Sequence, residues 1–232
     1  NLQHVELLLQ EACRANPYNY PAWVRYLGIK AGGAGDKKKL EYLIQFSKAM
    51  PREHNLIDYV AGHVLKINPE KVNPYELYAC GVSPDSTPEA EELFIRQFWK
   101  KLIADCPEVK LHAVYKEGTT GNFLNLWLEK SKNVKWNSKM KSKTSKAFQQ
   151  ALLALTGKEK IFIKMMKSYR RFLIMWNDEK YMMQAHEFVQ DHLKGITSDQ
   201  VKKEMAGMGR KMGILLKNDK ILNMYGQTRE SE

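Results

Sequence analysis

The residues best suited to chemistry are basic, and most lie in KSKNVKWNSKMKSKTSK, residues 130–146, which holds seven lysines and no acid. Lysines in such a run can contact phosphates while an interleaved aromatic ring stacks on a base. The stretch lacks arginine, whose planar fork is typical of specific phosphate recognition. There are two alternatives. The stretch is a solvated loop that leads into a helix, or it contacts an acidic protein surface. The candidate polyanion-binding residues here are Lys135, Trp136, Lys139, Lys141 and Lys143.

A second basic element lies in the segment 158–177. Lys160, Lys164, Lys167 and Arg171 are spaced by four, three and four residues, so they share one face of a helix. Such a helix can lie on a membrane surface or enter a partner's groove, and it is also typical of a core helix with a cationic polar face. Lys164, Lys167 and Arg171 complete the candidate polyanion-binding set.

Catalytic and metal-binding patterns are weak or absent. The cysteines Cys13, Cys80 and Cys106 are far apart and form no C-x-x-C pair, which indicates free thiols rather than a disulfide framework. His186 and His192 are six residues apart, too far around a helix to share a metal ion without other ligands. We therefore predict no catalytic residue, no metal site and no cofactor.

The net charge of +11 is placed unevenly along the 232 residues. Residues 1–100 hold 12 Lys and Arg against 12 Asp and Glu, whereas residues 101–232 hold 25 against 14. This asymmetry indicates an anionic partner for the C-terminal part or a well-solvated surface. No run of 18 apolar residues is present, so we predict no transmembrane segment.

The chain begins at Asn1 without a methionine or a signal segment, so we expect a fragment or a processed form of a longer protein. Three cysteines that cannot all pair favour a reducing compartment such as the cytoplasm. The sequence assigns neither the localisation nor the oligomeric state.

The elements that must position these residues are all predicted to be helices, because apolar residues recur at helical spacing and no convincing run alternates with period two. Asn16-Pro17 ends the first helix and Pro21 begins the next. The tyrosine-rich turn between them is interpreted as a joint, with Trp23 packed between paired helices. The expected helices cover residues 2–15, 21–31, 36–50, 54–67, a short one near 75–80, then 88–106, 108–116, 122–131, 146–156, 158–177, 179–194, 198–217 and 219–225.

The N-terminal part also shows a repeat period, since Pro17 and Pro51 are 34 residues apart. The intervening motifs, in order, are Ala22-Trp23, Leu27-Gly28, Gly35-Asp36 and Leu40, and the preceding packing residues are Val5, Leu9 and Ala12. Residues 2–67 therefore resemble the tetratricopeptide repeat family. The chain departs from that pattern by one extra residue before Gly35 and by Leu40 in place of a small residue. A generic array of helical hairpins is the alternative.

The resemblance implies stacked helix pairs whose inward-facing residues bind a protein or peptide partner. At this surface we expect Tyr18, Tyr20, Arg25 and Tyr26 to make the contacts.

Together, these patterns predict an all-α fold in which repeat-like antiparallel helix pairs continue into a larger helical bundle or stack. Residues 1–80 are expected to form tetratricopeptide-like hairpins, and residues 81–232 a basic, methionine-rich helical region, unless both form one continuous domain. The predicted function is a non-enzymatic scaffold for protein–protein interaction within a larger protein. Binding of nucleic acid or another polyanion by the C-terminal half is the first alternative, and an accessory domain of an unrecognised enzyme is the second.

Overall fold

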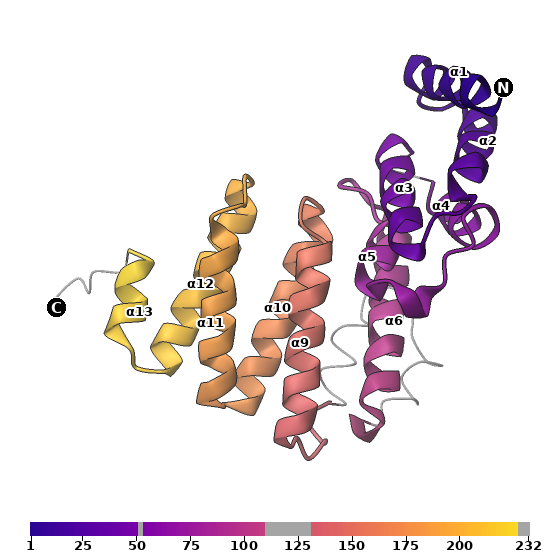
Figure 1. Cartoon of the computed structure of the whole chain (residues 1–232). Helices are drawn as coiled ribbons and strands as arrows, with labels where there is room; N and C mark the ends of the chain where they lie inside the picture. The colour runs from indigo at the N-terminus through magenta and orange to yellow at the C-terminus, as the bar shows by residue number, and fades with distance from the viewer. Residues whose placement is uncertain (51–52, 110–130, 227–232) are drawn as a thin grey trace. The chain divides into compact units, whose positions relative to one another are not determined.

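The computed structural model describes residues 1–50, 53–109 and 131–226, and every regular element in these ranges is helical (Figure 1). The prediction of an all-α fold is therefore confirmed for them. The expected helices at 108–116 and 122–131 fall almost wholly outside the described residues. The α-helices are α1 (Leu2–Ala15), α2 (Tyr20–Ala31), α3 (Asp36–Ala49), α4 (His54–Tyr59), α5 (Pro74–Ala79), α6 (Pro88–Asp105), α9 (Ser138–Ala154), α10 (Glu159–Trp176), α11 (Glu179–Leu193), α12 (Asp199–Leu215) and α13 (Asp219–Met224).

Three shorter helices complete the set: the π-helix η1 (Val60–Val64) and the 3₁₀ helices η2 (Pro69–Lys71) and η3 (Pro107–Val109). The chain divides into two compact units, unit 1 (residues 1–94) and unit 2 (residues 95–232), and the division lies inside α6. Each unit is described by itself. The proposed boundary between residues 80 and 81 stays a prediction.

Asparagine side chains set many of the helix starts. Asn19 Oδ1 accepts a hydrogen bond from the Ala22 N–H at 3.2 Å, and Asn137 Oδ1 accepts one from the Met140 N–H at 3.0 Å. Such caps satisfy an N–H group that the helix leaves without an internal partner. Pro21 lies in the first turn of α2, where its missing N–H costs nothing. The expected helix starts near residues 20 and 36 therefore agree with the structure.

Unit 1 is built on α2, which packs against α1, α3 and η1. Leu27, Leu43 and Phe46 are fully buried in its core. The Trp23 ring lies edge-on to the Phe46 ring of α3, with centroids 5.6 Å apart, and the Trp23 Nε1–H donates to the Pro17 carbonyl at 2.9 Å. The interpretation of the tyrosine-rich turn as a joint between packed helices is thus confirmed.

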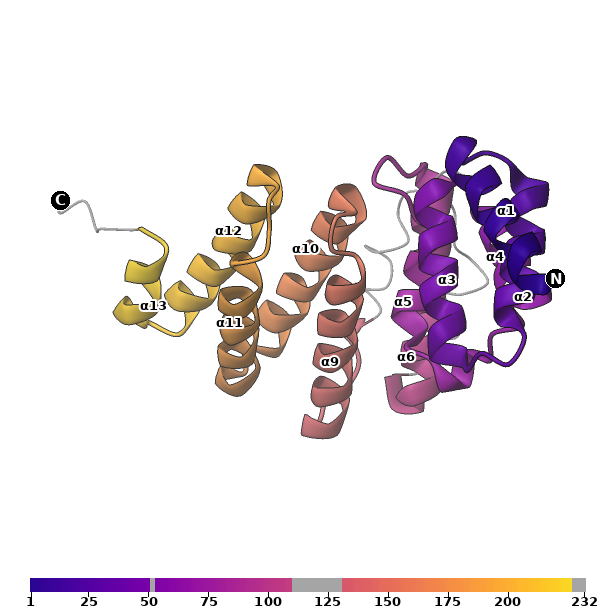
Figure 2. The ribbon, with the colours of Figure 1, turned by 45° about the horizontal axis from the view of Figure 1, so that its top comes forward.

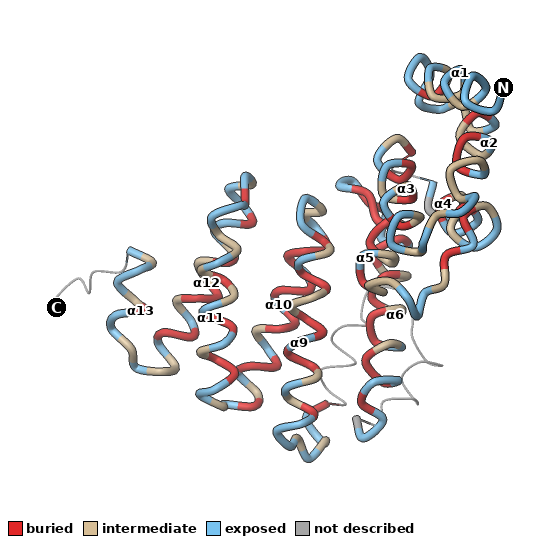
Figure 3. Tube along the Cα trace, in the orientation of Figure 1, coloured by how far each residue is buried: buried red, intermediate tan, exposed pale blue. Residues whose placement is uncertain are grey.

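In unit 2, α9 to α12 form two successive helical hairpins (Figures 1 and 2). Helix α9 packs against α10 and α11, while α12 packs against α10, α11 and α13. The helices therefore lie in two layers, with α9 and α11 in one and α10 and α12 in the other. Figure 3 shows buried residues recurring along all four helices. Stacked aromatic rings fill the first hairpin, where Phe148 and Tyr169 lie 5.2 Å apart at 11°.

Helix α9 begins at Ser138, eight residues before the expected start at residue 146. The early turns of its buried face carry Met140, Thr144 and Ser145, so small hydroxyl residues replace the expected apolar side chains. Ser145 Oγ and the Tyr169 hydroxyl lie 2.5 Å apart, which satisfies both polar groups. The spacing of apolar residues does not reveal this buried face, because two of its early residues are polar.

Candidate functional site

Two exposed rings stack on each other at the surface of unit 1. The Tyr59 side chain is 48% exposed, and its ring is stacked on that of exposed His63 with centroids 4.7 Å apart and planes at 13°. Helix α4 ends at Tyr59, and the wider π-helix η1 begins at Val60. Such π turns frequently occur at functional sites. The stacked pair therefore spans a local change of helix type that the sequence pattern did not reveal.

Tyr20, at the start of α2, is the third ring of this surface. Burial raises the pKa of the Tyr20 hydroxyl, and the nearby Tyr59 raises that pKa further. Tyr20 is half-buried against the core of unit 1, and its helix α2 packs against η1, which begins directly after Tyr59. We call Tyr20, Tyr59 and His63 the aromatic patch.

The other predicted partner-binding residues have different surroundings. Tyr18 lies in the turn before α2 and its side chain is 74% exposed, and Arg25 is also exposed. Tyr26 is only 8% exposed and packs edge-on against Trp23 with centroids 6.1 Å apart. The prediction that Tyr26 contacts a partner is corrected, because its face of α2 belongs to the core.

The predicted polyanion-binding lysines of unit 2 are largely engaged with other groups. Because a neighbouring carboxylate neutralises a lysine, such a pair offers less charge to a phosphate. Lys135, Lys164 and Arg171 have exposed side chains. Among the engaged residues are Lys139 with Glu108 at 3.6 Å, Lys141 with Asp178 at 2.9 Å, Lys167 with Glu204 at 3.8 Å, and Lys143 with the backbone carbonyl of Asp105.

Trp136 is part of the aromatic core of unit 2. Its ring lies 5.2 Å from that of Trp176 and 5.6 Å from that of Phe172, measured between centroids. Its Nε1–H donates to the Ser131 carbonyl at 3.0 Å. The expectation that this ring stacks on a base is corrected, because the ring packs against two aromatic residues of the core and its N–H is already bonded within the fold.

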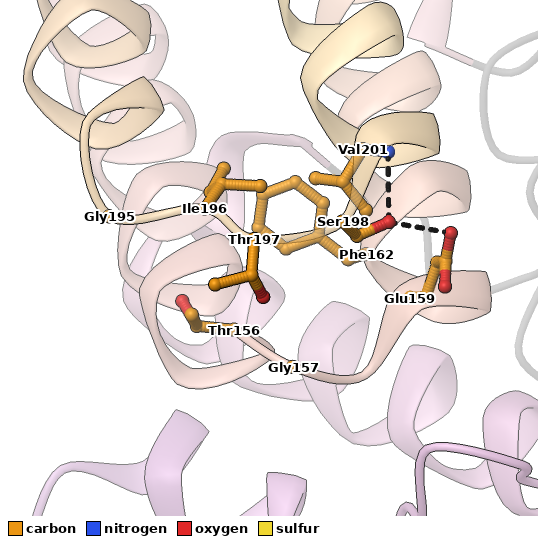
Figure 4. A pocket seen from close by; sticks show the side chains of 9 residues that line it. All are labelled: Thr156, Gly157, Glu159, Phe162, Gly195, Ile196, Thr197, Ser198 and Val201. Atoms are coloured by element: carbon orange, nitrogen blue, oxygen red, sulfur yellow. Dashed lines mark hydrogen bonds between the residues drawn. The ribbon is translucent and has the colours of Figure 1, made fainter.

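A pocket of about 390 Å³ lies between the turns that join α9 to α10 and α11 to α12 (Figure 4). Phe162, Ile196 and Val201 are its buried apolar residues. On its polar side the Ser198 hydroxyl donates to Glu159 Oε1 at 2.8 Å and accepts from the Val201 N–H at 3.3 Å. The pocket offers hydroxyls and one carboxylate, a set that can hold a small polar group, and its Ser198 hydroxyl also caps the start of α12.

Cysteine and metal chemistry find little support in the part of the chain that the structure describes. Cys13, Cys80 and Cys106 are buried free thiols, and burial raises the pKa of Cys13 and of Cys106. A thiol with a raised pKa keeps its proton and is a poor nucleophile. Among the described residues, no group of three His, Cys, Asp or Glu side chains is placed to hold a metal ion. None of the described helices is both long enough and apolar enough to cross a membrane.

The burial of two histidines of α11 leads us to predict that unit 2 becomes less stable in acid. Burial lowers the pKa of His186 and of His192, and the neighbouring Glu187 and Asp191 only partly oppose this. The unfolded chain takes up these protons near the ordinary histidine pKa of about 6.5, so it binds more protons than the folded chain below that pH. The unfolding free energy is therefore expected to fall as the pH falls through about 6.5.

Urea unfolding at about pH 7.5 and about pH 5.5, on either side of the histidine pKa, measures this effect. His186→Gln, which cannot take up the proton, is expected to lose less stability between the two pH values than the wild type does. Equal losses would show that the buried imidazole does not contribute.

The aromatic patch was only partly predictable. Tyr20 belongs to the predicted set, whereas Tyr59 and His63 do not. Their spacing of four residues within the expected helix 54–67 was the available signal, because such residues lie on one helix face.

Comparison of the chain with protein-family models, with curated proteins and with solved structures gives no match. The geometry of the patch therefore carries the functional argument.

Proposed function

We propose that this chain is a non-enzymatic helical domain that binds a protein or peptide partner through the aromatic patch of unit 1. The observation that supports it is the half-exposed Tyr59, whose ring is stacked on that of His63 at the point where η1 begins and α2 packs. Aromatic side chains with a polar tip contribute much of the binding energy at protein interfaces. A ring already ordered by stacking loses less conformational freedom when the partner binds.

The tetratricopeptide-like pairing of residues 2–67 is part of this proposal. In repeats of that kind, one face of the stacked helix pairs forms the binding surface. Tyr18 and Arg25 are exposed near the start of α2, the same helix that carries Tyr20. They would extend the partner-binding surface from the aromatic patch along this helix. The wider role is that of a scaffold within a larger protein.

Binding of nucleic acid or another polyanion is the weaker candidate. The exposed side chain of Lys135 favours it, but at least half of the eight predicted residues are engaged with carboxylates or a backbone carbonyl. The two candidates differ in their response to salt. Polyanion binding weakens steeply as salt rises, because each phosphate contact releases counterions, whereas binding at an aromatic patch changes little.

Tyr59→Ala tests the proposal directly. A library of random peptides displayed on phage, selected on the wild-type chain, supplies the probe, and isothermal titration calorimetry measures the affinity of an enriched peptide. Truncation of an interface aromatic residue typically costs about 2 kcal/mol or more, so Tyr59→Ala is expected to weaken binding about 30-fold.

Leu153→Ala is the matched control, because Leu153 in unit 2 is 49% exposed, almost the same as Tyr59. It is expected to leave the peptide affinity unchanged. The proposal is wrong if the selection yields no peptide that binds the wild type, or if the enriched peptides bind Tyr59→Ala as tightly as the wild type.

A further inference from the structure

Helix α13 docks on a face of α12 that has two glycines. Gly209 and Gly213 are both buried beneath the last described residues. A Cβ atom on Gly209 would lie 2.1 Å from Cζ of Tyr225, and one on Gly213 would lie 2.9 Å from Cγ2 of Ile221. Real Cβ atoms essentially never approach so closely. The lack of a side chain at both positions is therefore what allows α13 and Tyr225 to pack here.

Tyr225 also reaches α11, the neighbouring helix. Its hydroxyl lies 2.9 Å from Nδ1 of the buried His186, and the two rings meet edge to face with centroids 5.8 Å apart. Ile221, one turn earlier, is buried against α12. We call Gly209, Gly213 and His186 the α13 docking surface. It is shaped for a helical turn that presents isoleucine and tyrosine four residues apart.

The connection that holds α13 in place is short and strained. Residues 216–218 join α12 to α13, and Lys217 adopts a φ of 51°, in the left-handed region. This conformation is unfavourable for a residue with a side chain and favourable for glycine. Helix α13 has only six residues, so it is too short to be stable without its docking contacts.

We propose that the α13 docking surface also binds the α13 segment of a second copy of this chain. In this exchange α13 leaves its own docking surface, Lys217 relaxes to an ordinary helical conformation, and α13 docks on the partner copy, which returns the same segment. Every contact of Ile221 and Tyr225 is then made between chains instead of within one. Short, strained connections of this kind favour such swapping.

The inference is independent of the aromatic patch, because all of the residues that carry it lie in unit 2. Among the described helices, α13 is the one that fits this surface. The partner that we propose is therefore the α13 segment of a second copy. The exchange relieves the strained conformation of Lys217 in each copy. This gain in free energy offsets part of the cost of association.

A complementation experiment on the full chain tests the exchange. Gly209→Val blocks the docking surface but keeps an intact α13, whereas Tyr225→Ala impairs α13 but keeps the surface open. The wild type is expected to show a dimer fraction that rises with protein concentration by size-exclusion chromatography with light scattering. Each variant alone is expected to be monomeric, and an equimolar mixture is expected to form a one-to-one heterodimer detected by native mass spectrometry.

Lys217→Gly tests the same exchange with a variant that is expected to fold at least as well as the wild type. Glycine adopts the left-handed conformation without strain, so α13 stays on its own chain. The dimer dissociation constant is expected to rise about 25-fold, about fivefold for the relieved connection of each copy.

Three outcomes would overturn the proposal. The first is a wild-type chain that stays monomeric at every concentration. The second is a mixture of Gly209→Val and Tyr225→Ala that forms no heterodimer although both variants retain the helical circular dichroism of the wild type. The third is a Lys217→Gly variant whose dimer is as stable as that of the wild type.

Discussion

Phe172→Ala is expected to lower the unfolding free energy of unit 2 by about 3–5 kcal/mol, the usual cost of removing a buried phenylalanine ring. Phe172 is fully buried in α10. Among the described residues, four aromatic rings surround it at centroid distances between 5.5 and 5.8 Å, those of Trp99, Trp136, Phe148 and Trp176. Because rigid rings move little into a vacated space, the cavity is expected to persist. Urea unfolding followed by circular dichroism measures the loss.

Ile174→Ala is the control for this prediction. Ile174 lies two residues further along the same helix and is 38% exposed, so its truncation leaves no enclosed cavity. We expect it to cost less than about 1 kcal/mol, as surface substitutions commonly do. Equal costs for the two variants would show that the aromatic cluster does not form the core of unit 2.

Phe46→Ala is expected to have a comparable effect on unit 1, about 3–5 kcal/mol. Phe46 of α3 is fully buried, and its ring meets the Trp23 ring of α2 edge to face. The substitution removes a contact between two helices of the unit. The protein therefore loses packing interactions as well as buried apolar surface. Chemical denaturation with urea measures the change in the unfolding free energy.

Gln45→Ala, at the neighbouring exposed position of α3, supplies the comparison. Alanine is a good helix former and Gln45 is not part of the core, so its removal is expected to change the stability by less than about 0.5 kcal/mol. A Phe46→Ala variant that unfolds at the same urea concentration as Gln45→Ala would contradict the assigned core.

Much of the fold could be predicted because local rules decide where helices begin and end. Asn19 and Pro21 define the start of α2 through capping and a fixed φ, and Trp23 packs against α3 as expected. The start of α9 could not be predicted in this way. Thr144 and Ser145 occupy its buried face, and the hydroxyl of Ser145 is satisfied by Tyr169, which lies far away in the sequence.

The candidate site was predictable only in part, because it depends on contacts between distant segments. Tyr20 and Tyr59 lie on different helices, and the packing of α2 against η1 brings the two segments to the same part of unit 1. The sequence likewise shows a lysine at position 141 but does not show that Asp178 neutralises it. Charge and residue type can be counted along a chain, whereas pairing requires the folded arrangement.

By itself the sequence determined that this protein is helical, because helical periodicity and capping are local properties of the chain. It also determined the excess of positive charge in the C-terminal half. Only the tertiary structure decided which aromatic side chains are buried, which lysines are paired, and that Gly209 and Gly213 admit Tyr225 and Ile221. The physical reason is that burial, ion pairing and close approach depend on residues far apart in the chain, which packing alone brings together.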